Sequence, residues 1–202
     1  MALGTPELLV LLFLFVPLGL VAIMVIFGVM AYNRLVRARN QLREGWSGIE
    51  VQLKRRHDLV PALVECVRGY QTHERDLLES VTRERTEAGA AHDAASASGL
   101  EQRLGRDLGK IVALVEAYPE LRADGRFLDL MRELVETEDL LQYARRYYNG
   151  SARDLNNTVE SFPSNIVARM GGFKTAAFFE VERASERLPP DLAGQLRGGI
   201  SH

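Results

Sequence analysis

The hydrophobic pattern of the chain changes character at its first cluster of charges. Before that cluster, one uncharged run extends from Leu8 to Asn33, between Glu7 and Arg34. About 18 or more consecutive apolar residues can cross the hydrocarbon core of a bilayer as a helix, which satisfies its own backbone hydrogen bonds there. The run therefore predicts a transmembrane helix over residues 8–31, with the lipid bilayer as the partner of Leu8–Ala31.

A cleaved signal peptide and a buried core helix share this hydrophobicity. A signal peptide has a basic start, an apolar stretch of about 7–15 residues and a cleavage site of small residues. This chain begins MALGTPE, without Lys or Arg, and its apolar run is longer. A core helix without a charge on any face is unusual in so small a protein. The membrane span is the better interpretation.

The flanking charges predict how the span is oriented. Only Glu7 precedes it, whereas the segment that follows is basic and contains Arg34, Arg37, Arg39, Arg43, Lys54, Arg55 and Arg56. Positive residues near a membrane helix stay on the cytoplasmic side. We therefore expect residues 1–7 to form a short extracytoplasmic tail and the large domain to lie in the cytoplasm.

Beyond the span, apolar residues recur in alternating steps of four and three, which is typical of a helix that packs along its length on other helices. The first such seam comprises Leu42, Trp46, Ile49, Leu53, Val60, Leu63, Val67 and Tyr70, and resumes at Leu77 and Val81. Because no proline separates Leu18 from Val60, we expect the span to continue into the domain as one helix. At Pro61 the helix either kinks, which the unbroken heptad phase favours, or restarts with Asp58 as N-cap.

Two further seams predict two more long helices. The second comprises Leu100, Leu104, Leu108, Ile111, Val115 and Tyr118, and the third comprises Phe127, Met131, Leu134, Leu141, Tyr148, Leu155, Val159 and Phe162. Residues 86–99, small and polar, predict a flexible connection. Pro163 ends the third helix because the residue before a proline avoids helical geometry.

The C-terminal part of the chain predicts shorter elements. Ser164 can N-cap a short helix through Met170, which Gly171-Gly172 would end. An amphipathic segment over residues 175–188 carries Phe178 and Phe179, which we expect to close the end of the bundle. The expected fold is all-α: a single N-terminal transmembrane helix followed by an antiparallel bundle of three long helices plus short C-terminal helices over residues 32–188, with a disordered tail over 189–202.

Charged residues interrupt the seams. Arg56 on the first helix and Glu138 on the third are candidates to meet across the bundle, since an unpaired buried charge is expensive. The alternative is that these side chains reach solvent by extending their apolar stems. Gly45 and Gly48 weaken the first helix by about 1 kcal/mol each relative to Ala, and favour either local flexing or close packing.

Composition and motifs give no support to an enzyme. The net charge is −2, with both signs interspersed, which is unlike a nucleic-acid-binding protein. Cys66 is the single cysteine, so a disulfide within the chain and a cysteine zinc cage are excluded. The four histidines make no His-Glu-x-x-His pattern, and no phosphate-binding loop or Gly-x-Ser-x-Gly elbow occurs. We expect no catalytic site, no cofactor and no metal.

The most individual stretch of the domain is the aromatic and basic run from Gln142 to Asn149. Tyrosines bury large areas and keep a polar tip, which suits a bundle core and a protein interface alike. Its arginines could bind an acidic partner or a lipid head group, while packing is the default interpretation because Tyr148 lies on the seam. The candidate interaction or packing residues are Trp46, Arg55, Arg56, Pro61, Glu138, Arg145, Arg146, Tyr147, Tyr148, Asn149, Phe162 and Pro163.

Several blocks taken together resemble the LemA family of bacterial membrane proteins. They are Tyr32-Asn33-Arg34-Leu35-Val36, Trp46, Val51 to Arg56, Asp58-Leu59-Val60-Pro61, Val67-Arg68-Gly69-Tyr70, Ala117-Tyr118-Pro119, Ala144 to Asn149, Phe162-Pro163-Ser164-Asn165 and Gly172-Phe173-Lys174. They recur in order over the chain from Tyr32 to about Glu182. Ala62 departs from the Asn that the family often has after the proline.

The resemblance implies a single N-terminal span in a bacterial membrane followed by an antiparallel bundle of long helices. It implies little about activity, since it supplies no catalytic role to carry onto these residues. It agrees with our first hypothesis, a non-enzymatic membrane scaffold that binds other proteins and is capable of self-association. One alternative is an accessory or regulatory subunit of a membrane-bound enzyme such as an envelope protease. Another is a component of bacterial membrane-organelle formation, a process with which some relatives are associated.

Overall fold

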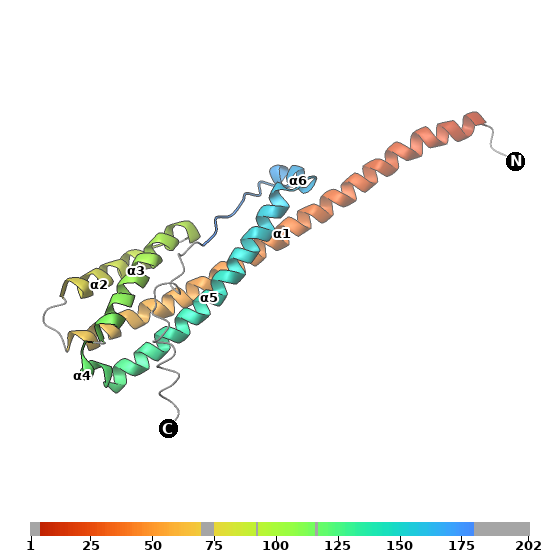
Figure 1. Cartoon of the computed structure of the whole chain (residues 1–202). Helices are drawn as coiled ribbons and strands as arrows, with labels where there is room; N and C mark the ends of the chain where they lie inside the picture. The colour runs from red at the N-terminus through yellow and green to blue at the C-terminus, as the bar shows by residue number, and fades with distance from the viewer. Residues whose placement is uncertain (1–4, 70–74, 92, 116, 180–202) are drawn as a thin grey trace, which may run out of the picture. The chain divides into compact units, whose positions relative to one another are not determined.

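The computed structural model describes residues 5–69, 75–91, 93–115 and 117–179, and within them every regular element is an α-helix. The helices are α1 (Thr5–Arg68), α2 (Arg75–Gly89), α3 (Ala94–Val115), α4 (Pro119–Arg122), α5 (Gly125–Glu160) and α6 (Ser164–Met170), as Figure 1 shows. The expected all-α fold is confirmed. The chain divides into two compact units, the first made of Met1–Arg43 with Gly150–Ala176 and the second of Glu44–Asn149 with Ala177–His202.

Helix α1 is continuous from the apolar run to Arg68. The expected continuation of the span into the domain as one helix is therefore confirmed, and the alternative in which a new helix starts near Asp58 is wrong. Pro61 is exposed, while its neighbours Val60 and Leu63 are buried. Their packing holds the helix together although the proline removes one backbone hydrogen bond.

The first seam is divided between two helices. Helix α1 ends at Arg68, and the Gly69 amide still donates to the carbonyl of Glu65 (3.3 Å). Leu77 and Val81, which the sequence pattern attached to the first helix, belong to α2. The heptad phase misled here because α2 also packs an apolar stripe on the same core, and glycine is a poor residue for continuing a helix.

The second unit has an apolar core contributed by all of its helices. Its buried residues come from α1 (Leu59, Val60, Leu63, Val64, Cys66, Val67), α2 (Leu78, Val81, Ala88), α3 (Leu104, Leu108, Ile111, Val115), α4 (Leu121) and α5 (Phe127, Met131, Leu134). Helices α1 and α5 are antiparallel, because Arg55 pairs with Glu136 and Glu65 pairs with Arg126. The expected antiparallel packing is confirmed.

The first unit has a smaller core in which α6 packs on α1. It comprises Leu35, Ala38, Leu155, Ala168 and Phe173, and Figure 1 shows α6 beside α1. The expected short helix and its end at Met170 are confirmed, but Ser164 as its N-cap is wrong, because the helix begins at Ser164 itself. Pro163 occupies the N-cap position. The Ser164 hydroxyl instead lies 2.7 Å from the carbonyl oxygen of Thr158 and 2.9 Å from that of Ser161, at the end of α5.

Two glycines end α6 as expected. The Gly171 amide donates to the carbonyl of Val167 (2.8 Å), and the Phe173 amide donates to that of Ala168 (2.9 Å). Gly172 adopts φ +67°, a left-handed conformation that favours glycine. This reversal directs Phe173 back onto the core of the first unit.

Three expected features differ in the structure. The connection predicted over 86–99 is shorter, because α2 extends to Gly89 and α3 begins at Ala94, where alanines favour helix over a flexible loop. The turn before α5 contains the short helix α4. The described part of the segment 175–188, residues 175–179, is not helical, although Phe179 is buried as expected. The rest of that segment and the tail 189–202 lie outside the described residues.

Candidate interaction site on α1 and α5

A chain of charged side chains, with Arg56 and Glu101 fully buried, links three helices of the second unit. Arg56 on α1 donates from Nη1 to Oε2 of Glu101 on α3 (3.2 Å), and its Nε lies 2.9 Å from Oε1 of Glu138 on α5. The predicted meeting of Arg56 and Glu138 is confirmed, and the solvent-exposed alternative for Arg56 is wrong. His57 completes the group, with Nε2 2.7 Å from Oε1 of Glu101.

The buried guanidinium of Arg56 needs room on α3. A Cβ atom at Gly105 would lie 2.9 Å from Nη2 of Arg56. Glycine at this position therefore leaves the space that the arginine head occupies. Helix α2 also contacts α1 at this level, because Arg85 on α2 donates from Nε to the backbone carbonyl of His57 (3.0 Å).

Arg145 on α5, a second buried arginine, lies in the same electrostatic field as Arg56 and Glu138. Burial lowers the pKa of Arg145 to about 10, with Arg56 adding to the lowering and Glu138 opposing it. The side chain therefore remains charged at neutral pH. Its Cζ lies 5.3 Å from the ring centroid of Phe179, within the range of a cation–π contact.

Aromatic rings cover the end of this charged chain. The Trp46 ring centroid lies 5.9 Å from that of Tyr148 and 6.1 Å from that of Phe179. Trp46 donates from Nε1 to Glu50 (2.7 Å), and the Tyr148 hydroxyl donates to the carbonyl of Ala177 (3.0 Å). Burial raises the pKa of Tyr148, so the phenol stays protonated and can keep donating.

Asn149 fixes the segment that carries Phe179. Its Nδ2 donates to the carbonyl of Phe179 (3.2 Å), and its Oδ1 accepts from the Phe179 amide (2.8 Å). One side chain thus satisfies both backbone groups of a residue without a helical partner. In the first unit, Asn156 makes the same pair of bonds with Ala176, at 3.0 and 2.7 Å.

Helices α1 and α5 approach closely at Gly45. A Cβ atom there would lie 3.0 Å from Cα of Tyr148 and 3.2 Å from Cδ1 of Tyr147. Of the two interpretations offered by the sequence, close packing is the one that the structure shows at Gly45. At Gly48 the same atom would lie 3.9 Å from Cβ of Ala144, which is an ordinary contact.

The outer face of α5 is different in character. Tyr143 is 65% exposed, and the guanidinium of Arg146 lies over its ring with Cζ 4.5 Å from the centroid. Tyr147 and Leu140 on α5 are also exposed, as is Val51 on α1. Residues 140, 143 and 147 share one face of a helix. The aromatic and basic run is thus split between a buried inner face and an exposed outer face.

The sequence-predicted residues do not form one cluster. The inner face brings together Trp46, Arg56, Glu138, Arg145, Tyr148 and Asn149, whereas Arg55, Arg146 and Tyr147 lie on or near the surface. Pro61 is exposed on α1, and Phe162 and Pro163 belong to the first unit.

Sequence reasoning missed Glu101, His57 and Phe179 as partners of the charged chain. A signal for Glu101 existed in the spacing of α3. Counting back from Ile111 in alternating steps of three and four gives Leu108, Leu104 and then position 101. The apolar Leu100 drew the predicted seam one residue away.

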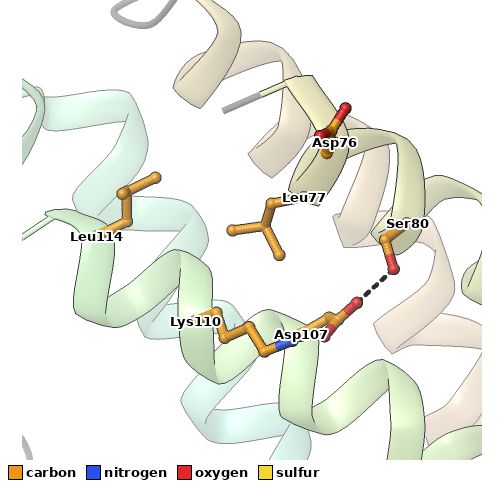
Figure 2. A pocket seen from close by; sticks show the side chains of 6 residues that line it. All are labelled: Asp76, Leu77, Ser80, Asp107, Lys110 and Leu114. Atoms are coloured by element: carbon orange, nitrogen blue, oxygen red, sulfur yellow. Dashed lines mark hydrogen bonds and ion pairs between the residues drawn. The ribbon is translucent and has the colours of Figure 1, made fainter. Parts of the chain in front are cut away.

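A surface hollow of about 500 Å³ lies between α2 and α3, lined by Asp76, Leu77, Ser80, Asp107, Lys110 and Leu114 (Figure 2). Asp107 accepts from the Ser80 hydroxyl (2.5 Å) and from Lys110 Nζ (2.7 Å). Burial opposes ionisation of Asp107, but these hydrogen bonds lower its pKa overall. The carboxylate is therefore a paired structural anion and a weak candidate for a general base.

Other candidate chemistry is sparse among the residues that the structure describes. They contain no group of three or more His, Cys, Asp or Glu side chains that could hold a metal ion. Burial raises the pKa of the Cys66 thiol, which disfavours the reactive thiolate.

The apolar part of α1 is as exposed as its sequence suggests. From Leu14 onward, α1 is long and apolar enough to cross a membrane, and only 6% of its most apolar stretch is buried. Large side chains from Leu14 to Ile26 are exposed by at least half. A core helix of a soluble protein would be mostly buried, so this exposure argues for lipid contact.

Comparison with known proteins gives consistent matches. The family model described as LemA family matches residues 45–193. Magnetosome protein MamQ 2 from Paramagnetospirillum magneticum is 27% identical over 195 residues, covering 83% of this chain and 72% of the relative. Magnetosome protein MamQ from Magnetospirillum gryphiswaldense is 24% identical with the same coverage. Protein LemA from Metamycoplasma hominis is 26% identical over 162 residues, covering 80% of this chain and 74% of the relative.

Proposed function

This chain belongs to the LemA family, and from that premise we propose that it is a single-pass membrane scaffold whose helical domain binds other proteins. Its membrane association is supported by the exposed apolar half of α1 and by its magnetosome-protein relatives. The proposal assigns residues 8–31 to the hydrocarbon core and gives the chain no catalytic activity of its own.

The proposed orientation places the domain in the cytoplasm of a bacterium, at the inner membrane. Its support is the charge asymmetry around the span, with Glu7 before it and Arg34, Arg37, Arg39 and Arg43 after it. An alkaline phosphatase fused after His202 should be inactive in cells, and a fluorescent protein fused there should be bright. An active phosphatase would reverse the orientation.

The observation that carries the scaffold proposal is the division of α5 into two faces. The polar side chains of the inner face make contacts within the domain, with Arg145 over the ring of Phe179 and Glu138 paired with Arg56. The outer face leaves Tyr143 exposed under Arg146. Tyrosine and arginine are enriched where proteins bind one another. A rigid inner face and an aromatic outer face suit recognition of a protein surface.

Membrane anchoring supplies the rest of the mechanism. Tethering two partners to one surface raises their effective concentration, so modest contacts are sufficient for association. The exposed Leu140, Tyr143 and Tyr147 on one face of α5 then need to provide only a small binding patch. The scaffold would assemble partners that are themselves at the membrane.

One more specific role has support from the comparisons. Two of the relatives are named magnetosome proteins and align over 83% of this chain. A role in forming a membrane organelle is therefore the second candidate function. Deletion of the gene with thin-section imaging of internal membranes would test it, and unchanged membranes would exclude it.

In-cell photocrosslinking tests the scaffold proposal. A photoreactive phenylalanine analogue at Tyr143 should give discrete adducts with membrane-associated proteins. The matched control is the same analogue at Asp129, which is exposed on α5 about four helical turns away and pairs with Arg132. Adducts at residue 143 that are absent at residue 129 would support the proposal. No adduct at residue 143, or identical adducts at both positions, would contradict it.

A further inference from the structure

The first unit exposes three large apolar side chains around α6. Phe162, in the turn before α6, is 80% exposed, Ile166 is 52% exposed and Met170 is 85% exposed. Ile166 and Met170 are four residues apart and share one face of the helix. Ala168 lies on the opposite face, buried in the cluster with Leu35 and Ala38. The helix is thus held by its small residue and presents its large ones outward.

The position of α6 along α1 indicates what could cover this face. Phe173, directly after α6, lies with its ring centroid 5.6 Å from that of Tyr32. Tyr32 follows Ala31, the last residue of the proposed span. Leu35 is four residues beyond Ala31, a rise of about 6 Å at 1.5 Å per residue. Helix α6 therefore packs on the first turns of α1 after the apolar run.

Burial along α1 gives the same position. Large side chains from Leu14 to Ile26 are exposed by at least half, whereas Ala31 is 6% exposed and Leu35 is fully buried. Packing of other segments of the first unit on α1 thus begins where the apolar run ends. Tyrosine at this boundary is typical of the interface between hydrocarbon and water.

Charge in the same region matches an anionic lipid surface. Residues 34–43 and 150–176 contain seven Arg or Lys and two carboxylates, Asp154 and Glu160. Arg169 lies on α6 between Ile166 and Met170, and Lys174 follows the helix, both exposed. Basic side chains beside a span are attracted to the anionic head groups of the cytoplasmic leaflet, and their stems can lie along apolar surface.

We propose that α6 is an interfacial foot: Phe162, Ile166 and Met170 insert into the head-group boundary of the bilayer that α1 spans, and Arg169 and Lys174 bind anionic head groups. This inference rests on the proposed membrane span. Interfacial helices bury their apolar faces about 5–10 Å into this boundary, which is within reach of a helix packed one turn past the span. A second attachment would restrict rotation of the first unit about α1.

Depth-dependent fluorescence quenching of the full chain tests the proposal. Met170→Cys, Ile23→Cys and Asp154→Cys variants, each labelled with an environment-sensitive fluorophore, are reconstituted in vesicles of phosphatidylcholine and phosphatidylglycerol containing a spin-labelled lipid. Wild-type protein, whose Cys66 is buried, gives the labelling background. Residue 23 reports on the span, and residue 154, exposed on α5 of the same unit, is the control outside the foot.

The proposal expects quenching at residue 170 to be several-fold stronger than at residue 154, and quenching at residue 23 to be strong as well. The additional changes Phe162→Ser and Ile166→Ser should reduce quenching at residue 170 and leave residue 23 unchanged. Strong quenching at 23 with equal, weak quenching at 170 and 154 would overturn the foot and leave the span. Weak quenching at residue 23 would overturn the span and the foot together. Disulfide-linked dimers of the unlabelled Met170→Cys variant, together with weak lipid quenching of the labelled one, would assign this face to a second copy and overturn the proposal.

Discussion

The buried guanidinium of Arg56 meets the carboxylate of the half-buried Glu138 in the second unit, with Nε 2.9 Å from Oε1. The same arginine reaches Glu101 on α3 through Nη1, so one side chain of α1 joins two other helices. A buried ion pair often contributes little net stability compared with apolar residues of similar volume, yet breaking it is costly. We infer that this group serves to select one packing register of α1, α3 and α5.

Glu101→Gln should destabilise the chain by about 3 kcal/mol, the lower end of the usual cost of removing one partner from a buried pair. The neutral amide keeps the volume but leaves Arg56 and His57 without the carboxylate. Chemical denaturation of the full chain in detergent micelles, followed by circular dichroism, measures the change. Glu136→Gln is the control, since its pair with Arg55 is exposed, and should cost less than about 1 kcal/mol. Equal effects of the two substitutions would show that burial of the network has no energetic role.

Gly45→Ala and Gly48→Ala should change stability in opposite directions. Alanine favours a helix by about 1 kcal/mol over glycine, and at Gly48 its Cβ makes only an ordinary contact with Ala144. At Gly45 the Cβ would lie 3.0 Å from a backbone atom of Tyr148, and overpacking typically costs about 1–3 kcal/mol. The midpoint temperature of thermal unfolding in micelles should therefore rise for Gly48→Ala and fall for Gly45→Ala. A rise for both would mean that the helices are free to move apart.

The sequence predicted these helices well where apolar spacing and sequence-local signals agreed. Pro163 and the Gly171-Gly172 pair defined α6 because the backbone geometry of proline and glycine acts within a few residues. The boundary at Gly69 was missed since α1 and α2 continue the same heptad phase. Gly45 illustrates the limit of such reasoning. Its low helix propensity can be read from the sequence, but its close approach to the backbone of Tyr148 is set by tertiary packing and is visible only in the structure.

The candidate site was only partly accessible to the sequence for a similar reason. Arg56 and Glu138 could be paired because both interrupt apolar seams. Glu101 was hidden by its neighbour Leu100, and Phe179 is placed by side-chain bonds from Asn149 to its backbone. Asn156, seven residues after Asn149, occupies an equivalent heptad position and makes the equivalent bonds to Ala176. That repeat was a usable signal for an extended segment along α5.

Glu84→Gln should stabilise the chain at pH 7, with an advantage that disappears in acid. Burial raises the pKa of Glu84 above its ordinary value of 4.5, and the nearby Asp107 carboxylate raises it further, against the opposing charges of Arg103, Arg83 and Lys110. The folded state therefore binds the Glu84 proton more tightly than the unfolded state does. Its contribution to stability falls as pH rises from about 4.5 through the raised pKa.

Denaturation of Glu84→Gln and wild type at pH 4 and pH 7 measures this dependence. The substitution should raise the free energy of unfolding at pH 7 and have little effect at pH 4, where Glu84 is protonated in both states. Glu79→Gln, an exposed position paired with Arg75, serves as the control. A stability difference independent of pH would contradict the assignment to Glu84 ionisation.

Asn149→Ala should release the segment that carries Phe179. The substitution removes two hydrogen bonds and leaves the Phe179 amide and carbonyl unpaired, at a cost of about 1–3 kcal/mol. Hydrogen exchange of the Phe179 amide in the full chain should accelerate by one to two orders of magnitude, while amides in the middle of α3 remain protected. Asn157→Ala, at an exposed position of α5, should leave the Phe179 amide protected. Unchanged exchange in Asn149→Ala would show that the Asn149 side chain does not hold the Phe179 backbone in place.

The central claim is that the domain binds its partners because α1 holds it at the membrane. In-cell photocrosslinking at Tyr147 measures this directly when the full chain is compared with an Ile23→Arg, Met24→Arg variant, whose two charges should prevent insertion of α1. We predict discrete partner adducts for the full chain, and a several-fold loss in the variant, with its helical content retained in detergent. Adducts of equal yield in a variant that fractionates as soluble protein, or no adducts from the anchored chain, would contradict the account.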